Sequence, residues 1–357
     1  MDRVLTSMPS LSSLYGKALV RPLQDRVRRS GAVSGLPAER HRVEGIAGAP
    51  DQVRGFQGLM RRPDVDVMPS GYVHTLVFPL GVSVLARPDF PLPLPGMIHL
   101  RNEIRHLRPI GLDERLTATA WVENLRGHRT GTQVDVVVEV EASGVPVWHG
   151  TSTYLAKGIQ LALPETDPVS DPTSEPRQEA VPPPDYPTSV WALPEDVGRR
   201  YAEVSGDYNP IHLSRLTARA MGMKRPIAHG MYLASRMVAD FGPGEESAFI
   251  WSADFHSPVS LPAQVALAPL TGGDNDGGGG REARSSPGIR VGVVRISPAG
   301  FSRCRPRGRG MMARWFAKVE GPLGIGRHFP RDVLQACEWG LLPVQTPVGQ
   351  LPLAAST

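Results

Sequence analysis

The chain has 357 residues, and its 41% apolar content is enough to fill two domain cores and too high for a disordered protein. It has only two cysteines, Cys304 and Cys337, which excludes a disulfide framework, and no apolar run approaches the roughly 18 residues of a membrane span. The net charge of +4 is uneven: residues 267–357 hold 12 basic and 6 acidic residues, a net of +6, which leaves −2 for residues 1–266. We therefore expect a soluble cytoplasmic protein whose basic character is confined to its tail.

The first domain expected along the chain covers residues 1–162 and contains an antiparallel meander. Three strand-like runs follow one another at 114–125, 132–143 and 145–158. Valines alternate with charged residues in the middle run, which predicts a sheet with one solvated face, and Ser143-Gly144 is a hairpin turn. The preceding segment 72–90 is apolar nearly all round, which fits a buried helix or a buried strand.

A proline-rich, acidic stretch at 163–189 has the composition of an extended linker and divides the chain into two halves. The second domain is expected at 190–266. Its pattern predicts three helices, at 194–207, 213–223 and 227–242. Extended, strand-like sequence follows at 247–268. The helix at 227–242 is so apolar that we expect other structure to wrap around it.

The two halves can be laid over one another with an offset of about 149 residues, which indicates a duplicated unit. Gly81-Val82 then falls on Gly230-Met231, and Arg108-Pro109-Ile110 falls on Ser257-Pro258-Val259. The second half carries Asp207 and His212 near its start, and the first half has no counterpart of these two residues. One half is therefore expected to hold the chemistry while the other completes the fold.

Those residues lie in the stretch VSGDYNPIHLS, where Asp207 and His212 are five residues apart. Five residues at 100° each place two side chains on different faces of a helix, so the two converge only if the chain turns between them. Pro210 restricts the backbone, and the amide of Asn209 can tie down neighbouring groups, which favours such a turn. A carboxylate and an imidazole aimed at one water form an acid–base pair. The alternative is an Asx-type turn before a helix, without chemistry.

The segment RPIAHGMYL adds a second element. A helix that begins at His229-Gly230 presents free backbone N–H groups, and Gly230 lets a substrate approach that backbone closely. Such a site suits a thioester carbonyl that becomes enolate-like in the transition state. His229 itself is expected to be structural, because the positive end of a helix disfavours an imidazolium ion.

Together these segments resemble a known family. Residues 201–214, YAEVSGDYNPIHLS, and residues 225–237, RPIAHGMYLASRM, are similar to the (R)-specific enoyl-thioester hydratases, the MaoC-like or hydratase-2 group. The two-half layout resembles the actinobacterial double-hotdog 3-hydroxyacyl-thioester dehydratases, whose N-terminal hotdog has lost the catalytic motif. The resemblance covers about residues 10–266.

The resemblance implies an α+β fold, a double hotdog in which each antiparallel sheet wraps around one central helix. It implies that Asp207 and His212 hold the catalytic water, and that the backbone N–H of Gly230 polarises the thioester carbonyl. In dehydration the pair would remove the C2 proton and protonate the leaving C3 hydroxyl, and hydration is the reverse. The R configuration and the acyl-CoA or acyl-carrier-protein substrate also come from the resemblance.

Residues 267–357 depart from the family pattern, because Gly, Arg and Pro dominate them. Their strand candidates are 288–296 and 311–321. Three interpretations stay open: a nucleic-acid-binding arm, which the lack of interleaved aromatic residues disfavours; a disordered appendage; and a frame change in a GC-rich gene, which its alternative reading frames would reveal. Without further strands the second sheet would have an open edge.

The predicted function is thus reversible hydration of trans-2-enoyl thioesters, or dehydration of (3R)-hydroxyacyl thioesters, in fatty-acid metabolism. The alternatives are a non-catalytic subunit that binds acyl thioesters, and an acyl-thioester hydrolase. No cofactor, metal, nucleic-acid partner or membrane span is expected, since Cys304, Cys337, His256 and His328 are too scattered for a metal site. Two hotdogs in one chain would form a pseudo-dimer, and a homodimer of such chains is the alternative to a monomer.

Overall fold

The computed structural model describes residues 2–20, 35–161, 189–242, 244, 247–270, 290–298 and 311–318. All of these fall in one compact unit, Met1–Glu320, while the second unit, Gly321–Thr357, lies outside the described residues. The predicted linker at 163–189 also lies outside them, apart from Ser189. Most of the predicted tail, residues 267–357, lies outside the described residues as well, so the prediction that it is disordered is not tested there.

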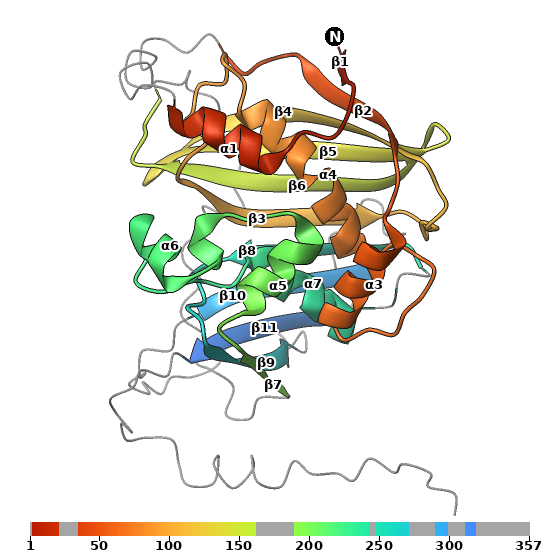
Figure 1. Ribbon diagram of the computed structural model, residues 1–357, viewed down its shortest axis with the longest axis vertical. Helices are drawn as coiled ribbons and strands as arrows, with labels where there is room; N and C mark the ends of the chain where they lie inside the picture. The colour runs from red at the N-terminus through yellow and green to blue at the C-terminus, as the bar shows by residue number, and fades with distance from the viewer. Residues whose placement is uncertain are drawn as a thin grey trace, which may run out of the picture. The chain divides into compact units, whose positions relative to one another are not determined.

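The first half of the unit is a central helix, α4, against a sheet that is antiparallel apart from the parallel pair β1–β2, with smaller helices beside it (Figure 1). Its elements are β1 (Asp2–Leu5), α1 (Leu11–Val20), β2 (Arg40–Ile46), α3 (Pro50–Leu59), α4 (Ser70–Leu85), β3 (Met97–His106), β4 (Leu116–His128), β5 (Gly131–Ala142) and β6 (Val145–Lys157). The apolar segment that fitted either a helix or a strand is therefore the helix α4. Its side chains are buried on nearly every side, as with Val73 and Leu80. No described helix is long and apolar enough to cross a membrane.

The predicted meander is confirmed as β4, β5 and β6, but its outer face is less solvated than predicted. Asp135 of β5 is only 7% exposed. Its carboxylate accepts a hydrogen bond of 2.7 Å from the Thr153 hydroxyl and pairs with Arg126 at 3.0 Å. The charge is buried because neighbouring strands satisfy it, which an alternating pattern in one strand does not reveal.

The second half repeats this plan with shorter elements. They are β7 (Ser189–Leu193), α5 (Val197–Ser205), the 3-10 turn η2 (Pro210–His212), α6 (Arg215–Ala220), α7 (Gly230–Phe241), β8 (Phe249–Phe255), β9 (Ala263–Leu270), β10 (Arg290–Pro298) and β11 (Met311–Lys318). The central helix is α7, whose residues from Met231 to Val238 are all buried. The predicted wrapping of this helix is confirmed.

Strands of both halves form one eleven-stranded sheet, in the order β1-β2-β4-β5-β6-β3-β8-β10-β11-β9-β7. The halves meet where β3 pairs antiparallel with β8, with Glu103 opposite Ser252. Backbone hydrogen bonds therefore join the two helix-and-sheet units into one body (Figure 1). This arrangement confirms the predicted double hotdog.

The second sheet extends beyond residue 266, where we placed the start of the atypical tail. Both strand candidates of the tail form strands, β10 and β11, and β10 pairs with β8 while β11 pairs with β9. Because these strands are present, the condition under which we expected an open edge after β9 is not met. The glycines and arginines of these segments do not prevent strand formation, because backbone pairing in a sheet does not require a continuous apolar pattern. Their order differs from the first half, where the last strand, β6, lies next to β3.

The duplication does not keep a constant offset. The strands β2 and β7 begin at Arg40 and Ser189, an offset of 149, whereas the central helices begin at Ser70 and Gly230, an offset of 160. Matching Gly81 with Gly230 is therefore wrong. The second half has 24 residues between α5 and α7, where the first has 10 between α3 and α4. The extra residues include Asp207, His212 and α6.

Candidate active site

The turn between α5 and η2 brings Asp207 close to His212. Gly206 ends α5 with a φ of +72°, a left-handed conformation that favours glycine. The Asp207 carboxylate then accepts the Asn209 N–H at 3.3 Å, and the Asn209 side chain accepts the Ile211 N–H at 3.3 Å. These two Asx-type contacts reverse the chain and start η2 at Pro210. The predicted turn is present, and it aims both side chains at one volume.

Two backbone contacts orient the histidines of the site. The Nδ1–H of His212 donates to the Ile227 carbonyl at 2.7 Å, which leaves its Nε2 with a free lone pair. The ring of His229 stacks on that of His212, with centroids 3.6 Å apart and planes at 25°. Its Nε2 lies 3.1 Å from the Asp207 carbonyl and 3.7 Å from the Asp207 carboxylate. His229 therefore holds the backbone of Asp207 and the ring of His212 in place.

Burial decides the protonation of these groups. It raises the pKa of the Asp207 carboxyl, and the neighbouring His212 and the Asn209 N–H oppose that rise only in part. Burial, followed by the neighbouring His229, lowers the pKa of His212 to about 3, and burial lowers the pKa of His229 to about 4. At neutral pH both imidazoles are therefore neutral, and the carboxyl is displaced toward its protonated form.

The buried histidines make stability dependent on pH. Burial also lowers the pKa of His74 to about 4 and that of His99 to about 3, as for His212 and His229. The unfolded chain binds protons near the ordinary value of 6.5, while the native state does not. We expect the free energy of unfolding to fall by about 2 kcal/mol per histidine between about pH 7.5 and about pH 5. Asp207 and Asp240, whose pKa values burial raises, oppose this trend, while His41 and His149, whose pKa values burial lowers, add to it.

Denaturant unfolding at several pH values measures this slope. His74→Gln removes one titrating group that is not part of the catalytic turn, so its slope should be smaller by about 1.4 kcal/mol per pH unit below about pH 6. A slope that is unchanged in the variant would show that His74 is protonated in the native protein.

Gly230 is the first residue of α7, and His229 is its N-cap. The first intrahelical bond runs from the Leu233 N–H to the His229 carbonyl, so the Gly230 N–H precedes the helical ladder. A Cβ on Gly230 would lie 2.8 Å from the ring of Phe255. Only glycine fits here, and its N–H lies at the positive end of the helix dipole.

The first half contributes aromatic residues that the sequence did not single out. His99 of β3 stacks on Tyr154 of β6, with ring centroids 4.7 Å apart, and contacts Phe255 of β8 at 4.9 Å with the ring planes tilted by 54°. Its Nε2 is buried without a hydrogen bond. Burial and then the charge of Asp207 raise the pKa of both Tyr154 and Tyr15. The site therefore lies where the two halves meet. No local motif marks these residues, because only the pairing of β3 with β8 places them beside the turn.

The equivalent position in the first half is closed. The start of its central helix, Ser70, accepts a hydrogen bond of 3.2 Å from the Trp148 indole at its carbonyl and one of 3.0 Å from the Trp251 indole at its hydroxyl. Both indoles are fully buried. Besides lacking the acid and the imidazole, the first half thus has its helix end covered by two tryptophans, Trp148 of its own β6 and Trp251 of β8 in the second half.

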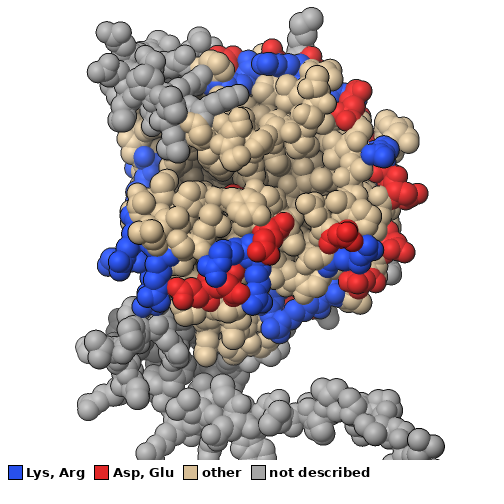
Figure 2. All heavy atoms as spheres, viewed as in Figure 1, with Lys and Arg blue, Asp and Glu red and all other residues tan. Residues whose placement is uncertain are grey.

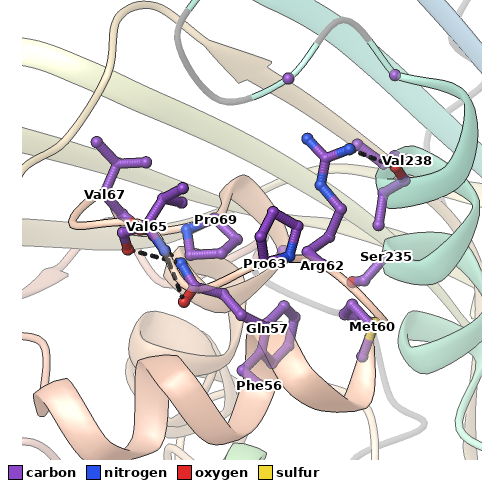
Figure 3. A pocket seen from close by; sticks show the side chains of 14 residues that line it. Phe56, Gln57, Met60, Arg62, Pro63, Val65, Val67, Pro69, Ser235 and Val238 are labelled. Atoms are coloured by element: carbon purple, nitrogen blue, oxygen red, sulfur yellow. Dashed lines mark hydrogen bonds between the residues drawn. The ribbon is translucent and has the colours of Figure 1, made fainter. Parts of the chain in front are cut away.

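A separate cavity lies between the α3–α4 connection and α7 (Figure 3). Apolar side chains such as Met60, Val65 and Val238 line it, and Arg62 reaches across to donate to the Ala239 carbonyl at 3.0 Å. The residues of the catalytic turn do not contribute to it. It is therefore distinct from the site built around Asp207.

Asp207, His212 and His229 are also close enough to offer a metal ion three ligand atoms, all within 4.8 Å of one another. The stacking of the two imidazoles disfavours this use. Imidazole lone pairs lie in the ring planes, and two nearly parallel planes 3.6 Å apart do not bring them together on one centre. The arrangement fits an acid–base pair better than a ligand set.

Comparisons with known proteins agree on one family. A family model described as MaoC like domain matches residues 172–284, which include the whole segment from Asp207 to Gly230. The chain is 32% identical over 243 residues to the 3-hydroxyacyl-thioester dehydratase X of Mycobacterium tuberculosis, over 68% of this chain and 83% of that protein. It is 38% identical over 69 residues to the (R)-specific enoyl-CoA hydratase of Aeromonas caviae, over 18% of this chain and 52% of that protein. The crystal structure of HtdX from M. tuberculosis matches with a TM-score of 0.54 at 26% identity, over 77% of this chain and 98% of that chain.

Proposed function

This chain belongs to the MaoC-like family of thioester dehydratases and hydratases, and from that premise we propose how its residues catalyse the reaction. It is a hydro-lyase that interconverts trans-2-enoyl and 3-hydroxyacyl thioesters. Asp207 and His212 are the acid–base pair, and they produce the (3R)-hydroxy configuration. Support comes from the turn, which converges both side chains on one volume beside a helix N-terminus.

In hydration, the neutral His212 takes a proton from water through Nε2 while the water oxygen bonds to C3. The Asp207 carboxyl, whose pKa is raised by burial, gives its proton to C2. The proton on His212 then returns to Asp207 through one bridging water, since the imidazole nitrogen and the carboxylate oxygen lie within 4.8 Å of one another. One water is added in total, with its hydroxyl on C3 and a proton on C2, and dehydration runs the same steps backwards.

Gly230 stabilises the charge that develops during this step. As the C3–O bond forms, electrons move toward the thioester oxygen, which becomes enolate-like. The Gly230 N–H at the start of α7 donates to that oxygen, and the helix dipole favours the negative charge. Asn209 and Pro210 hold the turn, and His229 holds His212 and the Asp207 backbone.

A spectroscopic assay tests the reaction. The enoyl-thioester absorbance of crotonyl-CoA and of a longer enoyl-CoA should fall on addition of the wild-type protein, with (3R)-hydroxyacyl-CoA as the product. Release of free thiol in its place would identify a hydrolase. A folded protein that binds enoyl-CoA without converting it would be the non-catalytic subunit. Either result would contradict the proposal.

Two finer points stay predictions. The cytoplasm is the expected compartment, and gel filtration coupled to light scattering would distinguish a monomeric pseudo-dimer from a homodimer of such chains.

A further inference from the structure

The segment that follows Asp207 has an unusual surface. Residues 208–225 contain four basic residues and no acidic one, although residues 1–266 as a whole carry a net charge of −2. Large apolar side chains are also exposed there: Tyr208 is 55%, Leu216 80% and Met221 47% exposed. Exposed apolar side chains surrounded by positive charges are typical of a surface that a binding partner covers.

Most of these cations have no carboxylate partner. Arg215 pairs with Glu195 at 2.8 Å, but among the described residues no ion pair joins Arg219, Lys224 or Arg225 to an acid. The nearby Arg200 is paired with Asp196 at 2.7 Å. The uncompensated charge is therefore concentrated on and after α6, not spread over the whole face.

This surface is attached directly to the catalytic turn. The Thr217 hydroxyl of α6 donates to the Pro210 carbonyl at 2.8 Å, and the Ile227 N–H donates to the Ile211 carbonyl at 3.1 Å. Figure 2 shows Lys and Arg gathered on the side of this face where α6 lies, next to a hollowed, uncharged region between α1 and α5. A partner bound there would lie beside the catalytic turn.

We propose that residues 208–225 form the docking surface for an acidic acyl carrier protein, which delivers the acyl group on its phosphopantetheine arm. This inference rests on the proposed function and names the carrier protein, not CoA, as the carrier of the acyl group. The phosphates of CoA could pair with cations, but its single adenine ring is too small to cover Tyr208, Leu216 and Met221 together. An acidic protein both complements the cations, which steers its approach, and covers the apolar side chains.

The test compares two substrates that share the crotonyl phosphopantetheine group, crotonyl-carrier protein and crotonyl-CoA. Arg219→Glu should lower the ratio of kcat/KM for the carrier protein to kcat/KM for CoA by about tenfold, through KM, because a rim charge acts on association. Leu216→Ser should lower the same ratio. Arg115→Glu is the control, since Arg115 is exposed and without an ion pair among the described residues but lies in the first half. It should leave the ratio within about twofold.

Binding separates this inference from the reaction itself. The Kd of crotonyl-carrier protein for the Asp207→Asn protein, measured by fluorescence titration, should rise when Arg219→Glu is added. A Kd that does not change overturns the docking surface even if hydration is confirmed. An equal loss with both substrates also overturns it, because the cations would then serve CoA. A wild type that hydrates neither substrate but binds the carrier protein through Arg219 would contradict only the proposed reaction.

Discussion

Asp207→Asn should lower kcat for crotonyl-CoA hydration by about 10² to 10⁴-fold, the usual contribution of a general acid or base. The amide is nearly the same size and can still accept the Asn209 N–H, so the turn should keep its shape. It carries no transferable acidic proton, so C2 is no longer protonated. Initial rates from the loss of enoyl absorbance measure the effect, and KM should change little.

Glu203→Gln is the matched control, because it removes an exposed carboxylate on α5 four residues from Asp207. It should keep wild-type kcat. The wild-type pH profile adds a second measurement: kcat for hydration should fall on the alkaline side as the Asp207 carboxyl, with its raised pKa, loses its proton. If Asp207→Asn were as active as the wild type, the acid would have to be another group, and the assignment of Asp207 would be wrong.

Gly198→Ala should impair both activity and stability, although Gly198 contacts no substrate. A Cβ at this position on α5 would lie 2.2 Å from the His212 carbonyl oxygen and 3.1 Å from its carbon. These are backbone atoms, so α5 or η2 must move. A displacement of about 1 Å in a catalytic group can cost on the order of 10²-fold in rate, and overpacking costs about 1–3 kcal/mol of stability.

The control for this variant comes from the first half. Gly58→Ala lies on α3, which corresponds to α5, and no atom outside its own helix lies within 4 Å of the added Cβ. It should stay active and unfold at the same or a slightly higher denaturant concentration. Equal kcat/KM for Gly198→Ala and the wild type would mean that η2 accommodates the shift without moving His212.

The first half acts as a structural partner to the second. Its central helix end is closed by Trp148 and Trp251, and it has no insertion between α3 and α4 to carry an acid and an imidazole. It still supplies His99 and Tyr154 to the catalytic side of the β3–β8 junction. The first half therefore has no catalytic acid–base pair of its own, but it still forms one wall of the site in the second half.

The sequence by itself determined the local features of this protein. Asp207, Asn209, Pro210 and His212 lie within six residues, so the turn that joins them depends on short-range rules for glycine, proline and asparagine. The meander of the first half and the wrapped helix that starts at Gly230 follow from hydrophobic periodicity in the same way.

Tertiary structure decided the features that depend on distant residues. The true equivalence of the two central helices emerged only when the strands were paired, because an insertion changes the offset between the halves. The places of β10 and β11 depend on backbone pairing with β8 and β9, which side-chain patterns barely record. Likewise Tyr154 and His99 reach the site across the β3–β8 junction. Side chains that meet through sheet pairing have no characteristic spacing in the sequence. Side chains that meet through one turn do have such a spacing, which is why the sequence reveals them.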